Sequence, residues 1–302
     1  MRSFTLNGTT ITDDSPAFVL AELGNNHQGS AEIAHRMIDA AADCGAHGVK
    51  FQRRTNATLY SAALLDQPYD HEQSFGATYG AHRAALELPL EVYPGLIQHA
   101  HDRGLACVCT AFDETAVDAL VGVGMDGLKI ASGGVTDVSL LRAARRTGLP
   151  LIVSTGGCAP WQIADAQAEA PAAALLHCTA SYPCAFEELN LRTIGWFQRT
   201  FPDTLIGWSG HDSGIAMAVV AYTLGARIIE KHITLNRAMK GTDHAFSLEP
   251  AGLKKLCRDL ARAHVALGDG GKRYYDSERK PIAKMRRRMT VDGLKITGEA
   301  DT

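Results

Sequence analysis

Residues 207–250 read GWSGHDSGIAMAVVAYTLGARIIEKHITLNRAMKGTDHAFSLEP, and this stretch decides how the rest of the chain is expected to fold. Its pattern predicts a strand, a loop, an apolar helix, a second strand and a polar loop. A histidine follows each strand: His211 stands just past the first, and His232 ends the second. Two histidines at the same end of neighbouring parallel strands can share one metal ion of the Mn, Fe, Co or Zn type.

Short apolar runs alternate with longer helical patterns along almost the whole chain. Near-continuous apolar runs are typical of strands buried on both faces, as in a parallel sheet. Eight strand–helix units over about 250 residues predict an α/β fold of the (β/α)8 TIM-barrel class. An open doubly wound sheet is the alternative, disfavoured because no Gly-x-Gly-x-x-Gly turn follows the first strand. The expected strands are 17–23, 47–52, 105–110, 127–132, 150–155, 173–178, 204–209 and 227–232, and the expected helices are 31–44, 90–104, 115–124, 138–148, 160–170, 191–201, 214–225 and 249–268.

Two segments stand outside this repeat. Residues 53–88 form a long polar excursion after the second strand, and a loop of this length is usually a lid or a binding loop. The tail from residue 270 is highly charged, which is typical of a solvated linker, although its end could add one strand or hairpin. We therefore expect a TIM-barrel domain over 1–269 and a charged tail over 270–302.

Composition limits the function classes. The chain has 302 residues, of which 46% are hydrophobic, so it can bury a large core. A formal net charge of -3 gives no general attraction to nucleic acid or membranes. No apolar run approaches the ~20 residues of a membrane span, and the N-terminus lacks a signal-peptide pattern. The seven cysteines contain no C-x-x-C pair, so we expect reduced thiols and a cytoplasmic location.

Polar residues at the strand ends are candidates for chemistry, because the active site of a TIM barrel lies at the carboxyl ends of its strands. Lysine charge, serine hydroxyls and glycine-flanked backbone N–H groups can hold a small anion. Lys50 and Lys129 are predicted to do so. A purely structural lysine–carboxylate pair is the alternative, which Lys231 could form with Glu230. His177, on an apolar strand, is predicted to be a core histidine.

Seven motifs together resemble the N-acetylneuraminate (sialic acid) synthase family. They are AELGNNHQGS, VKFQ, KIASG, LIVSTGG, LLHCTASYP, GWSGHDSGI and EKHITLNRAMKGTDHAFSLEP, and the match extends over residues 18–268. The resemblance implies a TIM-barrel enzyme that condenses phosphoenolpyruvate with the aldehyde of an acylamino sugar. It also implies a divalent metal, above all Mn²⁺ with Mg²⁺, Co²⁺ or Zn²⁺ as alternatives, and a homodimer.

The resemblance assigns roles by position. Glu22, His211, His232 and Lys129 are expected in the catalytic set, with the metal on His211 and His232. The residues expected to bind phosphoenolpyruvate are Lys50, Thr110, Lys129, Ser132, Ser154 and Ser209. On the acceptor side the resemblance places Glu22, Tyr182 and Asp243, and Gln52 joins the substrate-binding set as a strand-end residue.

Four departures from the family pattern concern the acceptor. The family usually has a carboxylate at the position of Gly134 and an aspartate at that of Gly210, and some members have asparagine at Ala180. The two lost carboxylates are expected to make the site less negative. We also expect the family's C-terminal antifreeze-like (SAF) domain to be missing, since the tail resembles only the linker and first strand leading into it. These changes predict an acceptor other than N-acetylmannosamine, which could be smaller, differently substituted or phosphorylated.

Two other functions remain open from the sequence. One is an aldolase that uses Lys129 or Lys231 as a Schiff base, which would not depend on metal. The other is a non-catalytic barrel that binds phosphoenolpyruvate or another ligand. Glycine at position 134, where the family has a carboxylate, is the feature that favours this second alternative.

Overall fold

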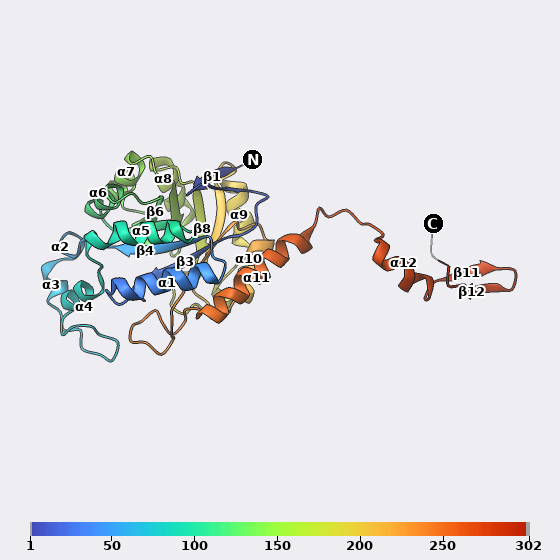
Figure 1. Ribbon diagram of the computed structural model, residues 1–302. Coiled ribbons are helices and arrows are strands. Elements are labelled where there is room, and N and C mark those ends of the chain that lie inside the picture. The colour runs from blue at the N-terminus through green and yellow to red at the C-terminus, as the bar shows by residue number, and fades with distance from the viewer. Residues whose placement is uncertain (1, 300–302) are drawn as a thin grey trace. The chain divides into compact units, whose positions relative to one another are not determined.

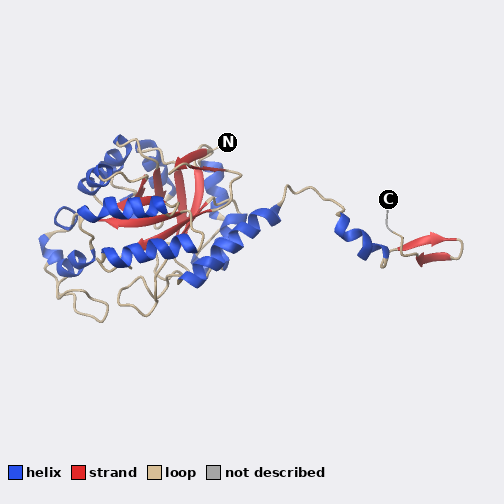
Figure 2. Ribbon diagram, viewed as in Figure 1, coloured by secondary structure: helices blue, strands red, loops and turns tan. Residues whose placement is uncertain are grey.

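The computed structural model describes residues 2–299 and divides the chain into two compact units, 1–264 and 265–302. The first unit is a closed barrel of eight parallel strands in the order β10-β3-β4-β5-β6-β7-β8-β9 (Figure 1). Helices surround these strands (Figure 2). The predicted TIM barrel is therefore confirmed, and the open doubly wound sheet is excluded.

All eight predicted strands are present, and every boundary lies within two residues of the predicted one. The eight predicted helices are present as well. The strands are β3 (Phe18–Gly24), β4 (Gly48–Arg53), β5 (Ala106–Ala111), β6 (Gly127–Ile130), β7 (Leu151–Ser154), β8 (Ala174–Cys178), β9 (Leu205–Gly210) and β10 (Ile228–His232). The helices are α1 (Ala31–Asp43), η1 (Leu90–Val92) leading into α5 (Tyr93–Asp102), α6 (Glu114–Gly122), α7 (Val138–Arg146), α8 (Pro160–Glu169), α9 (Thr193–Thr200), α10 (Ala216–Thr223) and α11 (Pro250–Leu267). Two further 3-10 turns, η2 (Ser132–Gly134) and η3 (Phe186–Glu188), lie in loops.

The apolar residues form two layers. Because successive side chains of a strand point to opposite faces, each strand contributes to both layers. The larger cluster fills the space between the strands and the helices, and it includes Ile229 and Trp208. The smaller cluster fills the barrel interior, and it includes Leu20, Val108 and Ile228. On each strand, residues that lie two or four positions from a member of the interior cluster therefore also face the barrel axis.

An N-terminal hairpin closes one end of the barrel and was not predicted. Strands β1 (Ser3–Leu6) and β2 (Thr9–Thr12) pair antiparallel. Leu6 and Ile11 are 1% exposed and belong to the interior cluster, with residues near the amino ends of the barrel strands such as Phe18. The hairpin thus covers the amino-terminal end of the barrel and leaves the carboxyl-terminal end for a site.

The segment 53–88 is not the irregular loop that its polar composition indicated. It folds into three short helices, α2 (Asn56–Leu59), α3 (Ala62–Leu65) and α4 (Tyr79–Leu86). The Thr78 hydroxyl caps α4 by accepting a hydrogen bond from the Ala81 N–H. Tyr79 makes edge contacts with Tyr60 and Tyr69 at ring-centroid distances of 5.4 Å. These aromatic contacts order a segment that lacks an apolar core pattern of its own.

The second unit contains a helix, α12 (Asp276–Ala283), and a hairpin of β11 (Arg287–Thr290) and β12 (Gly293–Ile296). The sequence allowed one strand or a hairpin at the end of the tail, and a hairpin is present, whereas α12 was not predicted. Within residues 2–299 every helix is too short or too polar to cross a membrane. The boundary after residue 269 stays a prediction.

Candidate active site

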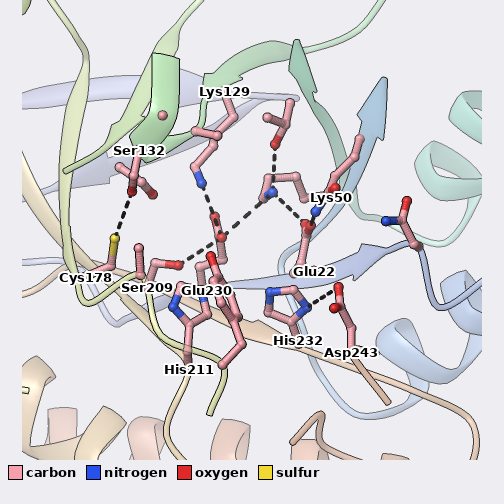
Figure 3. Close-up of a pocket in the computed structure, with 18 of the residues that line it drawn as sticks. Glu22, Lys50, Lys129, Ser132, Cys178, Ser209, His211, Glu230, His232 and Asp243 are labelled. Atoms are coloured by element: carbon pink, nitrogen blue, oxygen red, sulfur yellow. Dashed lines mark hydrogen bonds and ion pairs between the residues drawn. The ribbon is translucent and has the colours of Figure 1, made fainter. Parts of the chain in front are cut away.

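A cavity of about 360 Å³ opens at the carboxyl ends of the barrel strands (Figure 3). Every residue that the sequence assigned to catalysis, substrate binding or metal binding lines it. They are Glu22, Lys50, Gln52, Thr110, Lys129, Ser132, Ser154, Tyr182, Ser209, His211, His232 and Asp243.

Strand register brings the charged residues together. Glu22 is paired in register with Lys50 on one side and with His232 on the other. Glu230 is level with Ser209 on the neighbouring strand β9. Because paired residues of parallel strands point to the same face, these side chains all enter the barrel interior. The site is therefore built on the rigid barrel wall.

An ion-pair network occupies the floor of the cavity. Lys50 Nζ lies 2.6 Å from Glu22 Oε2 and 3.8 Å from Glu230 Oε1. Lys129 Nζ lies 3.5 Å from the same Glu230 oxygen, and Ser209 Oγ donates to that oxygen at 3.0 Å. Glu230 thus lies between the two lysines, as Figure 3 shows. Such a network holds two ammonium groups in fixed positions inside the barrel.

Burial and charge act against each other on these groups. Burial alone would raise the pKa of Glu230, but Lys129 and Lys50 beside it lower that pKa to about 2. Burial raises the pKa of Glu22 despite the Lys50 ammonium, and the nearby Glu230 adds to this rise. Burial lowers the pKa of Lys129. Glu230 therefore stays ionised. Of the two glutamates, Glu22 has the pKa nearer to neutral pH and is the better suited to exchange a proton.

Hydroxyl groups surround the lysines. Thr110 Oγ1 accepts a hydrogen bond from Lys50 Nζ at 2.8 Å. Ser132 Oγ accepts one from the Gly156 N–H at 2.9 Å and lies 3.3 Å from Cys178 Sγ. The Ser154 hydroxyl is buried and has no hydrogen-bond partner among the described residues. A buried hydroxyl without a partner is costly unless a ligand completes it, so this end of the cavity suits an anion with several oxygens.

The two histidines lie side by side in the cavity lining, with ring centroids 5.5 Å apart. Burial lowers the pKa of His211 to about 3 and that of His232 to about 4, so both rings are neutral at pH 7. His211 Nδ1 lies 2.8 Å from the Thr179 carbonyl oxygen. A carbonyl only accepts, so Nδ1 carries the proton and Nε2 keeps its lone pair for a ligand.

The donor set fits a divalent metal. His232 Nδ1 is buried without a hydrogen-bond partner and lies 3.7 Å from Asp243 Oδ2. Neutral imidazole nitrogens suit Mn²⁺, Fe²⁺, Co²⁺ and Zn²⁺. Residues 2–299 contain no cluster of three or more His, Cys, Asp or Glu side chains arranged to hold a metal. A metal on these two histidines would therefore take its other ligands from water and substrate.

The remaining assigned residues lie on the same side as the histidines. Gln52 Nε2 donates to Glu22 Oε1 at 2.6 Å. The Tyr182 ring lies 4.2 Å from that of His211 between centroids and is half exposed, at 55%. Asp243 comes from the loop after β10. The cavity thus has a lysine-and-serine end and a histidine-and-carboxylate end.

Lys231 does not belong to the site. It is not paired with Glu230, as the sequence allowed, but with Asp212, with Nζ 2.9 Å from Oδ1. Its neighbours Glu230 and His232 face the barrel interior, so alternation along β10 turns Lys231 to the outer face. There its Nζ lies 5.5 Å from the Trp208 ring centroid. A Schiff base on Lys231 is therefore excluded from this cavity.

The glycines at positions 134 and 210 also lie outside the cavity. A Cβ atom at Gly134 would meet Ile130 Cγ2 at 2.9 Å, and one at Gly210 would meet Trp208 Cη2 at 2.0 Å. Side chains at these positions would therefore point into the layer behind the strands. These Cβ directions do not support the expectation that glycine at the two positions makes the site less negative. Ala180 does line the cavity.

Sequence reasoning missed two charged residues of the cavity, Arg54 and Arg83, and named Glu230 only as a strand-end residue and possible partner of Lys231. The parity of β10 could have assigned Glu230 to the site, since it stands two residues before His232 and therefore shares its face. Arg54 and Arg83 come from the segment 53–88, whose helices were not predicted. His177, predicted as a core histidine, is buried, and its Nε2 lies 2.7 Å from the Leu189 carbonyl oxygen.

Comparison with known proteins finds one family of sugar-acid synthases by family model, by sequence and by structure. The model of the NeuB family matches residues 37–272. The chain is 36% identical over 279 residues to N-acetylneuraminate-9-phosphate synthase of Homo sapiens, covering 90% of this chain and 77% of that protein. It is 35% identical over 281 residues to N,N'-diacetyllegionaminic acid synthase of Campylobacter jejuni, covering 90% and 84%. The N-acetylneuraminic acid synthetase of Leptospira borgpetersenii, solved with citrate, superposes with a TM-score of 0.80 at 32% identity, covering 92% and 94%.

Proposed function

Because the chain belongs to the NeuB family, we propose that it joins phosphoenolpyruvate to the aldehyde of an acylamino sugar, giving a 2-keto-3-deoxy sugar acid and inorganic phosphate. The observation that carries the proposal is the division of one cavity into an anion-binding end and a metal-binding end. Two buried lysines and serine hydroxyls form the first, and two neutral histidines with Glu22 form the second.

The anion-binding end suits phosphoenolpyruvate. Its phosphate and carboxylate would take the places around Lys50 and Lys129, where Ser132, Ser154 and Ser209 offer hydroxyl groups. Carboxylate and phosphate oxygens pair well with ammonium groups that are already fixed in place. Glu230 lies beside both lysines and favours their charged form when no substrate is bound.

The metal-binding end suits the aldehyde. His211 and His232 would hold a divalent ion, most suitably Mn²⁺, which supplies Lewis acidity at the acceptor carbonyl when bound. Gln52 and Asp243 flank Glu22 and His232, in reach of the hydroxyls of an acceptor. The two reactants would then meet over Lys50 in a fixed geometry, which removes much of the entropic cost of a two-substrate reaction.

The reaction balances as follows. A bond forms between C3 of phosphoenolpyruvate and the aldehyde carbon, whose oxygen takes up a proton to become a hydroxyl. Water adds at C2, and the resulting tetrahedral phosphate collapses to the ketone and inorganic phosphate. Glu22 is placed to accept the proton of that water, because its raised pKa brings it closer to the working pH than Glu230. The lysines stabilise the negative charge of phosphate as it leaves.

We also propose a cytoplasmic homodimer that acts in carbohydrate biosynthesis. The cytoplasmic location is supported by the seven cysteines, which are all free. The acceptor is proposed to differ from unsubstituted N-acetylmannosamine, because the cavity carries arginines that the sequence did not lead us to expect.

The test is release of phosphate from phosphoenolpyruvate by metal-loaded protein over a panel of N-acyl aldoses, with mass-spectrometric detection of the 2-keto acid. Phosphate release that requires both an aldose and a divalent metal is expected. Absence of release with every aldose would contradict the proposal. Borohydride trapping of a keto substrate on Lys129 would instead assign the protein to the Schiff-base aldolases.

A further inference from the structure

Arg83 lies on α4 and lines the cavity, and the proposed reaction steps do not use it. Its guanidinium is fixed on one edge only. Nε donates to the Tyr79 hydroxyl at 2.9 Å, and Cζ lies 5.0 Å from the Tyr79 ring centroid. Because Nε is used in this way, the edge formed by the two terminal nitrogens is left for another partner.

This edge has no partner within residues 2–299. The hydrogen bonds and ion pairs of the described chain bring no acceptor to Nη1 or Nη2 of Arg83. The other cations of the cavity are each paired with a carboxylate: Lys50 with Glu22, Lys129 with Glu230, and Arg54 with Glu87. Arg83 is half-buried, so its charge is partly removed from water without a counter-ion. An anion bound there would offset that cost.

A chain of contacts places Arg83 on the side of the cavity above β4 and β5, across from the two histidines. Glu22 accepts from Gln52, and Gln52 Oε1 accepts from Arg54 Nη2 at 2.6 Å. Arg54 in turn pairs with Glu87, one helical turn after Arg83. Burial raises the pKa of Tyr60, while the charges of Arg83 and Arg54 oppose that rise, so both guanidinium groups lie near this tyrosine. Arg83 therefore lies across the cavity from His211 and His232, on the side that the far end of an acceptor would reach if its aldehyde lay at these histidines.

The chemistry of this edge selects its ligand. The two terminal nitrogens of a guanidinium form a planar fork that matches two oxygens of a phosphate or a carboxylate. Phosphoenolpyruvate already has Lys50, Lys129 and the serines of the barrel wall as its expected partners. The charge at Arg83 is thus left for the second substrate.

We propose that Arg83 binds a phosphate group on the acceptor, at the end away from the aldehyde, so that the substrate is a phosphorylated acylamino sugar. This inference rests on the proposed condensation with phosphoenolpyruvate. Arg83 acts as a specificity-determining residue, and Tyr79 acts as a positioning residue that holds the guanidinium through Nε.

The experiment compares N-acylhexosamines with their 6-phosphates in the presence of phosphoenolpyruvate and Mn²⁺. Calorimetry gives the affinity of each sugar, and phosphate release gives kcat and KM. The wild-type protein should favour the phosphorylated member of a pair by about 10- to 100-fold in kcat/KM, as expected for a charge-assisted fork. Arg83→Met should remove most of that preference through KM of the phosphosugar, while KM for phosphoenolpyruvate stays within about 3-fold.

Three further variants sharpen the result. Arg83→Lys keeps the charge but loses the fork, so it should restore only part of the preference. Tyr79→Phe should weaken phosphosugar binding less than Arg83→Met. Lys240→Met is the matched control, because Lys240 is an exposed cation whose Nζ lies over the Phe75 ring and which does not line the cavity. It should leave the preference intact, and thermal unfolding checks that each variant is folded.

The outcomes separate the two proposals. Phosphate release without a preference for phosphosugars, an equal effect of Arg83→Met and Lys240→Met, or a preference for a sugar carboxylate would overturn the role of Arg83 and leave the condensation standing. Tight, Arg83-dependent binding of phosphosugars without phosphate release from any pair would leave the Arg83 site standing and contradict the condensation.

Discussion

Glu22 and Lys50 form an ion pair inside the barrel, with Oε2 of Glu22 2.6 Å from Nζ of Lys50 and both side chains at most 2% exposed. They stand level with each other on β3 and β4. The pair joins the two ends of the cavity, because Lys50 also contacts Thr110 and Glu230 while Glu22 stands level with His232. A change at either residue should therefore affect one substrate more than the other.

Lys50→Met is expected to raise KM for phosphoenolpyruvate by about 10- to 100-fold, because it removes a charged hydrogen-bond donor from the anion-binding end. Steady-state kinetics with varied phosphoenolpyruvate measures this change. The matched control is Lys231→Met, which removes an equally buried lysine on the outer face. It should lower stability by about 3–5 kcal/mol, because Asp212 is left unpaired, without moving that KM. Equal effects of the two variants on KM would contradict the assignment of Lys50.

Glu22→Gln is expected to lower kcat by about 10²- to 10⁴-fold, the usual contribution of a general acid or base. The amide keeps the hydrogen bond to Gln52 possible but cannot accept a proton. Affinity for phosphoenolpyruvate should not weaken, because Lys50 loses a competing carboxylate. Single-turnover kinetics combined with calorimetry separates these effects. An unchanged kcat would show that Glu22 handles no proton in the slow step.

His211→Gln and His232→Gln are each expected to abolish Mn²⁺ binding and activity, since each removes one of only two candidate imidazole ligands lining the described cavity. Electron paramagnetic resonance of Mn²⁺ titrated into the protein measures binding without relying on turnover. The control is His177→Gln, a buried histidine whose Nε2 lies near the Leu189 carbonyl outside this cavity. Retention of Mn²⁺ binding by the variants at 211 and 232 would place the metal elsewhere.

Stability should fall between about pH 6.5 and pH 4, and His27 should account for part of this fall. Burial lowers the pKa of His27 from 6.5 to about 4. Between these values the unfolded chain binds the proton and the folded chain does not, so the free energy of unfolding decreases as pH falls. The full contribution of His27 is about 3 kcal/mol. Urea unfolding of His27→Gln at several pH values should show a shallower slope in this window, and an unchanged slope would contradict the assignment.

Gly210→Ala is expected to lower the free energy of unfolding by about 1–3 kcal/mol, because its Cβ atom would overlap the Trp208 ring at 2.0 Å. Gly95→Ala on α5 is the control, since an added Cβ there meets nothing within 4 Å. Denaturant unfolding of the two variants gives the comparison. Equal stability of both would show that the Trp208 ring moves aside freely.

The sequence alone was sufficient for the barrel and for most of the cavity lining. Buried parallel strands read as continuous apolar runs, so their number and bounds followed from local pattern. Lys50, Lys129 and both histidines were then placed at one end of the barrel, because the carboxyl ends of all strands in a closed parallel barrel lie at the same end and form its active site. The hairpin 3–12 and the helices of 53–88 were missed because short, polar or aromatic segments carry little periodic signal.

Only the tertiary structure decided which neighbours work together. Glu230 and Lys231 are adjacent in sequence and looked like a pair, yet alternation along β10 turns Glu230 to the lysines inside the barrel and Lys231 to Asp212 outside. Gly210 and Gly134 looked like losses from the site, but their Cβ directions point behind the strands. Arg83 reaches the cavity from a segment remote in sequence. A one-dimensional pattern gives the period of a strand, whereas the partner of each charge depends on register and on contacts between distant segments.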